Sequence, residues 1–232
     1  MKKRILSCFM ALTLCLTLLP ATALATDAAP AHQTHPICGQ TCSHTGPTHP
    51  DNAFANATGL SSYQGASTSD LIVEDGSADG NKAAVDSDTG FWSLPAGAYY
   101  LQGKGSGKDV TIDKPIVIRE KVTICLNGKT LQSKAQNKPV FLIEGGGELT
   151  LTNCNGTGQV IHNYNLNGSG TGVQVNSGTF NLYGGAITKN TADTFGGGVY
   201  VSGAYSKFNM YGGTISGNTA TKGGGGVYVE SG

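Results

Sequence analysis

The second half of the chain alternates apolar and polar residues in short runs separated by glycine or asparagine. In one such run, Phe180 and Leu182 fall on one face of a strand, while Asn181 and Tyr183 fall on the other. None of the runs has the 3.6-residue spacing of a helix, and the intervening glycines disfavour helix formation. The pattern therefore predicts short strands joined by tight turns.

These runs recur along the chain with a fixed period. A separation of 28 residues relates three pairs of positions: Phe180 and Phe208, Asn190 and Asn218, and Val199 and Val227. Such a period is typical of a repeat architecture. Weaker copies precede the two best ones and occupy three slots of the repeat: Val122–Ile124 and Leu149–Leu151 match Phe180–Leu182, Thr130–Leu131 and Val160–Ile161 match Ala186–Ile187, and Phe141–Ile143 and Val173–Val175 match Val199–Val201.

Three short strands per repeat predict one turn of a right-handed parallel β-helix. The fold class is then all-β, a solenoid of about 28 residues per turn that covers residues 91–232. Equivalent residues of successive turns stack at the strand spacing of about 4.8 Å and form ladders. We expect Asn190 and Asn218 to form a structural ladder at a corner, because asparagine tolerates left-handed backbone and bonds to its neighbours. The inward residues should be Phe180, Leu182, Ile187, Ala192, Val199 and Val201, with Phe208, Met210, Ile215, Ala220, Val227 and Val229 stacked on them.

The first 90 residues have a different composition. Residues 1–25 combine a basic start at Lys2, Lys3 and Arg4 with a short apolar run and a small-residue cleavage site, which predicts a secretory signal peptide. Residues 26–50 form a Cys/His-rich segment. Residues 51–90 are poor in large apolar side chains, so we interpret them as a low-complexity linker with one strand near Leu71–Val73. The mostly disordered N-terminal segment would thus precede a single folded region.

The charge balance excludes some partners. Removal of the signal peptide takes away three basic residues and leaves 12 basic against 15 acidic side chains, and no basic cluster stands out. We therefore expect no nucleic-acid partner. The apolar run of the signal peptide is too short for a membrane span, and we expect none in the mature chain.

The Cys/His-rich segment is a candidate metal site. His35, Cys38, Cys42 and His44 supply four ligands at short spacing that suit a tetrahedral zinc ion. The alternative is a disulfide between Cys38 and Cys42 in an oxidising exterior. Zinc is the one cofactor that the sequence suggests, and its role would be structural.

The repeats resemble the pectin-lyase-like right-handed β-helix group, specifically its bacterial surface-protein and adhesin branch. Polymorphic outer-membrane proteins carry a related pattern, to which Ile187-x-x-Asn190-Thr-Ala and the following Gly197-Gly-Val199 are similar. The second copy is Ile215-x-x-Asn218-Thr-Ala, followed by Gly225-Gly-Val227. The resemblance implies a cell-surface role and does not identify a ligand.

The same fold also hosts polysaccharide lyases and hydrolases, which need clustered carboxylates at defined spacing. The acids of this chain are scattered without repeat register, so we assign no catalytic residue and expect a non-enzymatic, adhesin-like protein. A polysaccharide-degrading enzyme and a small metal- or carbohydrate-binding module remain the alternatives. Outward tyrosines form two stripes that either face a ligand or stack on one another: Tyr183 over Tyr211, and Tyr200 over Tyr228.

The pattern stops in the middle of a repeat at Gly232. We expect the β-helix to be truncated there, with surface attachment through a missing C-terminal region, or to associate end to end through exposed strand edges. The adhesin-like role makes carbohydrate or a host or matrix protein the expected partner. The exposed strand edges add another copy of the chain.

Overall fold

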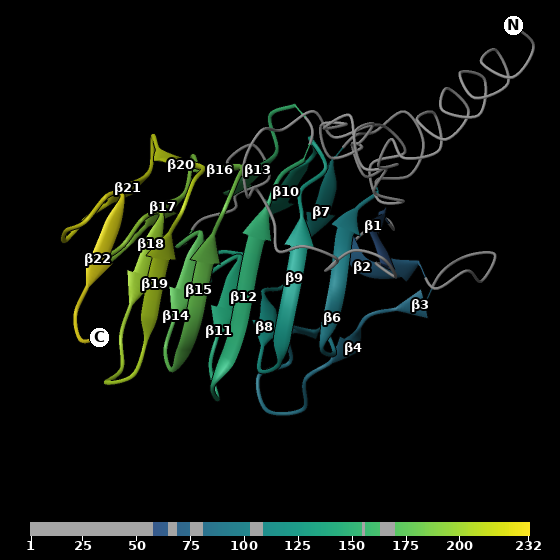
Figure 1. The fold of residues 1–232 in the computed structure, drawn as a ribbon, viewed down its shortest axis with the longest axis horizontal. Coiled ribbons are helices and arrows are strands. Elements are labelled where there is room, and N and C mark those ends of the chain that lie inside the picture. The colour runs from purple at the N-terminus through teal and green to yellow at the C-terminus, as the bar shows by residue number, and fades with distance from the viewer. Residues whose placement is uncertain (1–57, 65–68, 75–80, 103–108, 155, 163–169) are drawn as a thin grey trace, which may run out of the picture. The chain divides into compact units, whose positions relative to one another are not determined.

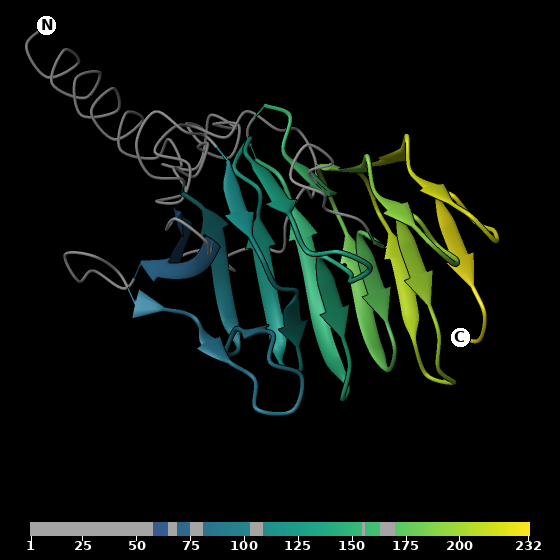
Figure 2. The ribbon, with the colours of Figure 1, turned by 180° about the vertical axis from the view of Figure 1, so that it is seen from behind.

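The computed structural model describes residues 58–64, 69–74, 81–102, 109–154, 156–162 and 170–232. These residues contain no helix, and they form a right-handed parallel β-helix of about four turns that lie about 28 residues apart. Successive turns follow one another along the solenoid, from β6 to β22, and the two views show its opposite sides (Figures 1 and 2). The fold class expected from the repeats is confirmed.

Three sheets run along the solenoid, and each turn contributes one strand to each sheet. The first sheet has the order β19-β15-β12-β9-β6-β1-β2-β3. Its strands are β1 (Thr58–Gln64), β2 (Ser69–Glu74), β3 (Asn81–Lys82), β6 (Gly97–Leu101), β9 (Lys121–Cys125), β12 (Gly147–Thr152), β15 (Gly178–Leu182) and β19 (Lys207–Met210). The second sheet has the order β20-β16-β13-β10-β7. Its strands are β7 (Val110–Ile112), β10 (Thr130–Ser133), β13 (Gln159–His162), β16 (Ala186–Thr188) and β20 (Thr214–Ser216).

The third sheet has the order β22-β18-β14-β11-β8-β5-β4. Its strands are β4 (Ala84–Val85), β5 (Trp92–Ser93), β8 (Ile116–Ile118), β11 (Phe141–Ile143), β14 (Val173–Val175), β18 (Val199–Val201) and β22 (Val227–Val229). A further two-stranded pair lies at the corner that follows the second sheet, β17 (Thr191–Ala192) with β21 (Thr219–Ala220). Every pairing between successive turns is parallel, as a solenoid requires.

Most of the expected register is confirmed by the strand pairing. Leu149 lies opposite both Val122 and Phe180, and Phe141 lies opposite Val173. One expected match was wrong by a residue. Val160–Ile161 was matched to Ala186–Ile187, whereas in the structure Gln159 pairs with Ala186 and Val160 with Ile187. Since side chains alternate along a strand, this shift turns Val160 inward, where it is fully buried, and leaves Ile161 on the outer face.

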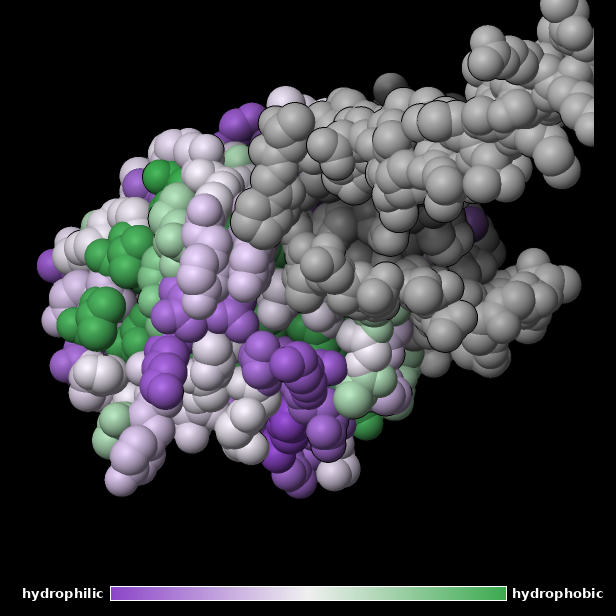
Figure 3. All heavy atoms as spheres, viewed as in Figure 1, coloured by the Kyte–Doolittle hydropathy of each residue, from purple (hydrophilic) through white to green (hydrophobic). Residues whose placement is uncertain are grey.

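The core is a stack of apolar ladders inside the three sheets. The six side chains expected to point inward in the turn of Phe180 are all buried, at 3% exposure or less. Phe180 and Phe208 stack with their ring centroids 5.2 Å apart. In the last described turn, Met210, Val227 and Val229 are more exposed, and apolar side chains gather on this end of the solenoid (Figure 3). Each of these residues has a stacked neighbour on one side only.

The described part of the range 51–90 holds more strands than the linker that the composition suggested, and the one strand expected near Leu71–Val73 is present as β2. It contains β1, β2, β3 and β4, of which β1 pairs with β2 in antiparallel fashion and with β6 in parallel. Leu60 and Leu71 are buried in the same cluster as the solenoid core. A few apolar residues are enough here because the solenoid already supplies the other side of the contact, and a compositional average does not register this.

Asparagines connect the turns at the corner between the second and third sheets. The Nδ2 of Asn190 donates to the Oδ1 of Asn218 at 3.0 Å and to the carbonyl of Thr188 at 3.0 Å. The Nδ2 of Asn218 donates in turn to the carbonyl of Ile187 at 2.8 Å. His162 of the preceding turn contacts this ladder, because its Nδ1 lies 2.9 Å from the Oδ1 of Asn190.

His162 is buried at 3% exposure, and its Nε2 lies 3.0 Å from the carbonyl oxygen of Lys138. Burial lowers the pKa of His162 below its usual 6.5, although the contacts to Asn190 and to the Lys138 carbonyl oppose this shift. The imidazole is therefore neutral in the folded protein at neutral pH.

No helix in the described part of the chain is long and apolar enough to cross a membrane.

The ladder predicts that acid destabilises the solenoid through His162. Because the folded-state pKa lies below 6.5, the unfolded chain takes up the proton first, and this stability is complete above pH 6.5 and falls as the pH decreases below it. One proton changes the free energy of unfolding by at most about 1.4 kcal/mol per pH unit. Denaturant unfolding at pH 7.5 and pH 5 should show a smaller pH effect for His162→Asn, which replaces the imidazole by an amide that does not titrate. An equal pH dependence in both proteins would contradict this assignment.

Candidate ligand-binding groove

A groove of about 650 Å³ crosses the outer face of the second sheet. Its floor consists of outward residues from successive turns, namely Gln159 on β13, Ala186 and Thr188 on β16, and Thr214 and Ser216 on β20. These side chains alternate with the buried Val160, Ile187 and the partly buried Ile215. The strands thus present one apolar face to the core and a row of small polar groups to the groove.

Glycines make the corner at one side of the groove low. The connection between β15 and β16 contains Gly184 and Gly185. In the next turn, Gly213 occupies the position equivalent to Gly185. Gly185 has a φ of +87°, and a Cβ atom at this position would lie 2.5 Å from Leu126 Cδ1. No other residue therefore fits without movement of the core.

A longer loop raises the neighbouring wall. The connection between β12 and β13 spans residues 153–158, whereas that between β15 and β16 spans only 183–185. Asn153 holds the loop, because its Oδ1 accepts from the Gly128 N–H at 2.8 Å and its Nδ2 donates to the Gly156 carbonyl at 3.0 Å. The extra residues, including Thr157, border the groove where the following turns leave it open.

Five polar side chains of the groove are not engaged with the protein. Among the described residues, no side-chain hydrogen bond or ion pair is made by Gln159, Thr188, Lys189, Thr214 or Ser216. Some outward polar residues elsewhere on the solenoid do pair with their neighbours. Asn209 donates to Asn181 at 2.9 Å, and Gln132 donates to Thr111 at 2.7 Å. The groove therefore offers donors and acceptors that a ligand can satisfy.

Tyr183 and Tyr211, expected as ligand-facing residues, do lie one over the other. Their ring centroids are 4.6 Å apart with an angle of 26° between the rings, so the face of Tyr183 that points to Tyr211 is occupied. Tyr183 borders the groove, and Tyr211 is 63% exposed. Tyr183 therefore has one ring face covered by Tyr211 and is not free to stack on a ligand with both faces.

Tyr200 and Tyr228, the second expected stripe, lie on the third sheet, away from the groove. Their centroids are 6.0 Å apart, and Tyr228 stacks more closely on Phe195, at 4.4 Å. The hydroxyl of Tyr200 donates to the carboxylate of Glu230, which raises the pKa of Tyr200 above its usual 10.0. Phe195 was not singled out in the sequence, because it falls between strands and outside the two-residue alternation.

The metal ligands expected at His35, Cys38, Cys42 and His44 lie outside the described residues. Within the described residues, no group of three or more histidine, cysteine or acidic side chains is arranged to hold a metal ion. The zinc site therefore stays a prediction from the sequence.

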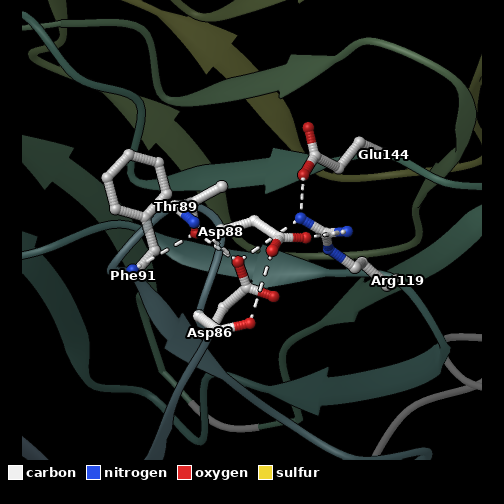
Figure 4. Close-up of polar contacts among 7 residues, drawn as sticks. Asp86, Asp88, Thr89, Phe91, Arg119 and Glu144 are labelled. Carbon is white, nitrogen blue, oxygen red and sulfur yellow. Dashed lines mark hydrogen bonds and ion pairs between the residues drawn. The ribbon is translucent and has the colours of Figure 1, made fainter.

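A cluster of acids gathers elsewhere, around Arg119 in the turn between β8 and β9 (Figure 4). The Nη2 of Arg119 lies 2.7 Å from Glu144 Oε1 and 3.3 Å from Asp86 Oδ1, while its Nη1 lies 3.4 Å from Asp88 Oδ2. The three acids come from two separate connections, one after β4 and one after β11. One guanidinium therefore joins the hairpin of β4 and β5 to the turns after β8 and β11.

Asp86 of this cluster is held in its ionised form. Hydrogen bonds from the side chain and the backbone N–H of Thr89 lower the pKa of Asp86 below its usual 3.8, and Arg119 acts in the same direction. Asp86 is therefore ionised at neutral pH and is not suited to proton donation. Arg119 occupies the position between the carboxylates that a metal ion would take.

Removal of the arginine should loosen the hairpin. We expect Arg119→Met to lower the free energy of unfolding by about 1 kcal/mol, the range of partly exposed ion-pair networks. Arg119→Lys should restore only part of this loss, because an ammonium cannot form the same forked contacts with several carboxylates. Denaturant melts in low and high salt measure both effects, and the difference between variants should shrink in high salt. Full stability of Arg119→Met would show that the network contributes nothing.

The chain was compared with known proteins in three ways. No protein-family model matches it, and no similar curated protein and no similar solved structure were found. The site must therefore be interpreted from its own geometry.

Proposed function

We propose that the chain is a secreted, non-enzymatic protein of the bacterial cell surface, adhesin-like in its role, which binds a carbohydrate chain in the groove of the second sheet. The assignment to the pectin-lyase-like group and its surface-protein branch is part of this proposal, and it rests on the repeated Ile-x-x-Asn-Thr-Ala pattern. Secretion rests on the signal-peptide pattern of residues 1–25.

The observation that carries the proposal is the set of unengaged polar groups on the floor of the groove. Gln159, Ala186 and Thr214 lie opposite one another on β13, β16 and β20, and Thr188 lies opposite Ser216 two residues further along. Hydroxyl and amide groups spread over three successive turns match a ligand that carries many polar groups along its length. A polysaccharide has this property, since each sugar presents several hydroxyls to the floor.

The shape of the groove supports an extended ligand rather than a compact one. The groove is open and crosses several turns, and Tyr183 is an aromatic residue among those that line it. Carbohydrate sites combine such aromatic groups with neutral hydrogen-bonding side chains. A host or matrix protein, the other expected partner, is usually bound through buried tryptophan, tyrosine or arginine side chains, and the residues of this floor include none of these.

The chemistry of the groove supports binding rather than cleavage. Glycoside hydrolysis needs a pair of carboxyl groups that flank the scissile bond. The described lining residues include no carboxylate, and Lys189 is the one charged side chain among them. The acids near Arg119 are paired with the guanidinium, as described above.

The proposal predicts that hydrophobic replacement of the floor weakens binding. Thr188→Val combined with Thr214→Val keeps the side-chain volume and the strand preference but removes two hydroxyls from the groove. We expect the affinity for a bound polysaccharide to fall about tenfold, the combined effect of two hydrogen bonds. Affinity gel electrophoresis of the purified chain in neutral xylan and in polygalacturonate provides the measurement, and titration calorimetry confirms the affinity.

Thr179→Val is the matched control, because Thr179 faces outward from β15 on the first sheet and is partly exposed. It should bind as the unmodified chain does. An equal loss in the control, or unchanged binding in the double variant, would remove the groove as the site. A chain that binds no polysaccharide at all would contradict the proposed function.

A further inference from the structure

Lys189 has an unusual backbone conformation. It follows β16 with a φ of 55°, in the left-handed region that side chains with a Cβ rarely adopt. The corner requires this conformation, because the Asn190 side chain donates to the Thr188 carbonyl across Lys189 and points into the ladder. One turn later, Gly217 has the same place and nearly the same φ, 62°.

Glycine is thus the residue that this corner favours, and lysine is the strained choice. The other described non-glycine residues with positive φ are Asn127 and Asn137, and asparagine tolerates this region well. Neither the fold nor the ladder explains a lysine here, because the side chain takes no part in the hydrogen bonds of Asn190. A strained residue that persists without a structural reason indicates a functional one.

The position of the side chain indicates that reason. Lys189 lines the groove and is exposed, and it makes no ion pair with any described residue. It is also the one charged residue among the described lining residues, so its ammonium sets the local electrostatic character of the groove. The neighbouring floor consists of neutral hydroxyls and an amide, which neither compete with nor neutralise it.

We propose that Lys189 binds the anionic group of an acidic polysaccharide, a carboxylate or a sulfate, in this groove. The inference rests on the proposed function and specifies its ligand class. The ammonium contacts one anionic group, while Thr188 and Gln159 contact the hydroxyls of the same or the neighbouring sugar. The left-handed corner keeps the lysine at the end of the floor.

The test replaces Lys189 by a residue that suits the backbone. Lys189→Asn removes the charge and retains a side chain that accepts a positive φ. We expect its affinity for polygalacturonate to fall about three- to tenfold at low salt. The affinity for neutral xylan should not change, and the difference between the two proteins should shrink when the ionic strength rises to about 0.5 M. A sulfated dextran tested in parallel distinguishes sulfate from carboxylate recognition.

Two controls separate this role from general effects. Lys207→Gln removes the same charge from the exposed Lys207 of β19, outside the groove, and should bind polygalacturonate normally. The midpoint of thermal unfolding of Lys189→Asn should be unchanged or up to about 2 °C higher, because the strain is relieved. A stable protein with weakened binding of acidic polysaccharide alone supports the proposal.

Three results overturn it. One is a loss of less than twofold for polygalacturonate and for sulfated dextran in Lys189→Asn. Another is an equal loss in Lys207→Gln, which would indicate a net-charge effect. The third is binding of neutral xylan only, which would leave the proposed function standing and exclude the acidic ligand. Failure of all three polysaccharides to bind would instead contradict the proposed function itself.

Discussion

Parallel main-chain pairing between successive turns is the constraint on which this structure depends. No turn buries its own apolar residues, because each contributes only one short strand to each sheet. Ile187 is fully buried between Val160 and Ile215, whereas Ile215, in the last described turn, is only partly buried. The ladder of Asn190 and Asn218 extends the same connection into a corner, where strand pairing ends and polar groups would otherwise be left without partners.

Backbone pairing and the inward ladders hold the turns together. The side chains at outward positions are therefore not required for the stability of the solenoid and are free to vary. On the first sheet they still connect turns, as Asn181 and Asn209 do. On the second sheet, Thr188 and Thr214 make no such connection, and glycines lower the adjacent corner. The groove thus arises where outward side chains are small and polar, not where the main chain departs from the solenoid.

The sequence predicted the parts that repeat, since stacking makes equivalent residues experience the same environment. Phe180 and Phe208, for example, are the same residue type and lie one repeat apart in the sequence, and this pattern correctly predicted that they stack. Val160 was misplaced by one residue because the longer connection before β13 disturbs the period, and alternation alone does not show where a strand begins. The strand near Leu71 was expected, but the strand of Leu60 and the burial of both leucines were missed, because that burial depends on a neighbour supplied by the solenoid. Lys189 gave no signal at all, since a positive φ is visible only in the folded chain.

The connection between β12 and β13 has a consequence for how such a protein diversifies. It is three residues longer than the connection of the following turn, yet Leu151 and Val160 on either side remain fully buried in register with Leu182 and Ile187. Insertions at this corner therefore change the wall of the groove without a compensating change in the interior. If the groove binds a ligand as proposed, the residues that determine specificity and those that determine stability lie at separate positions, and a change of corner loop leaves the buried stack intact.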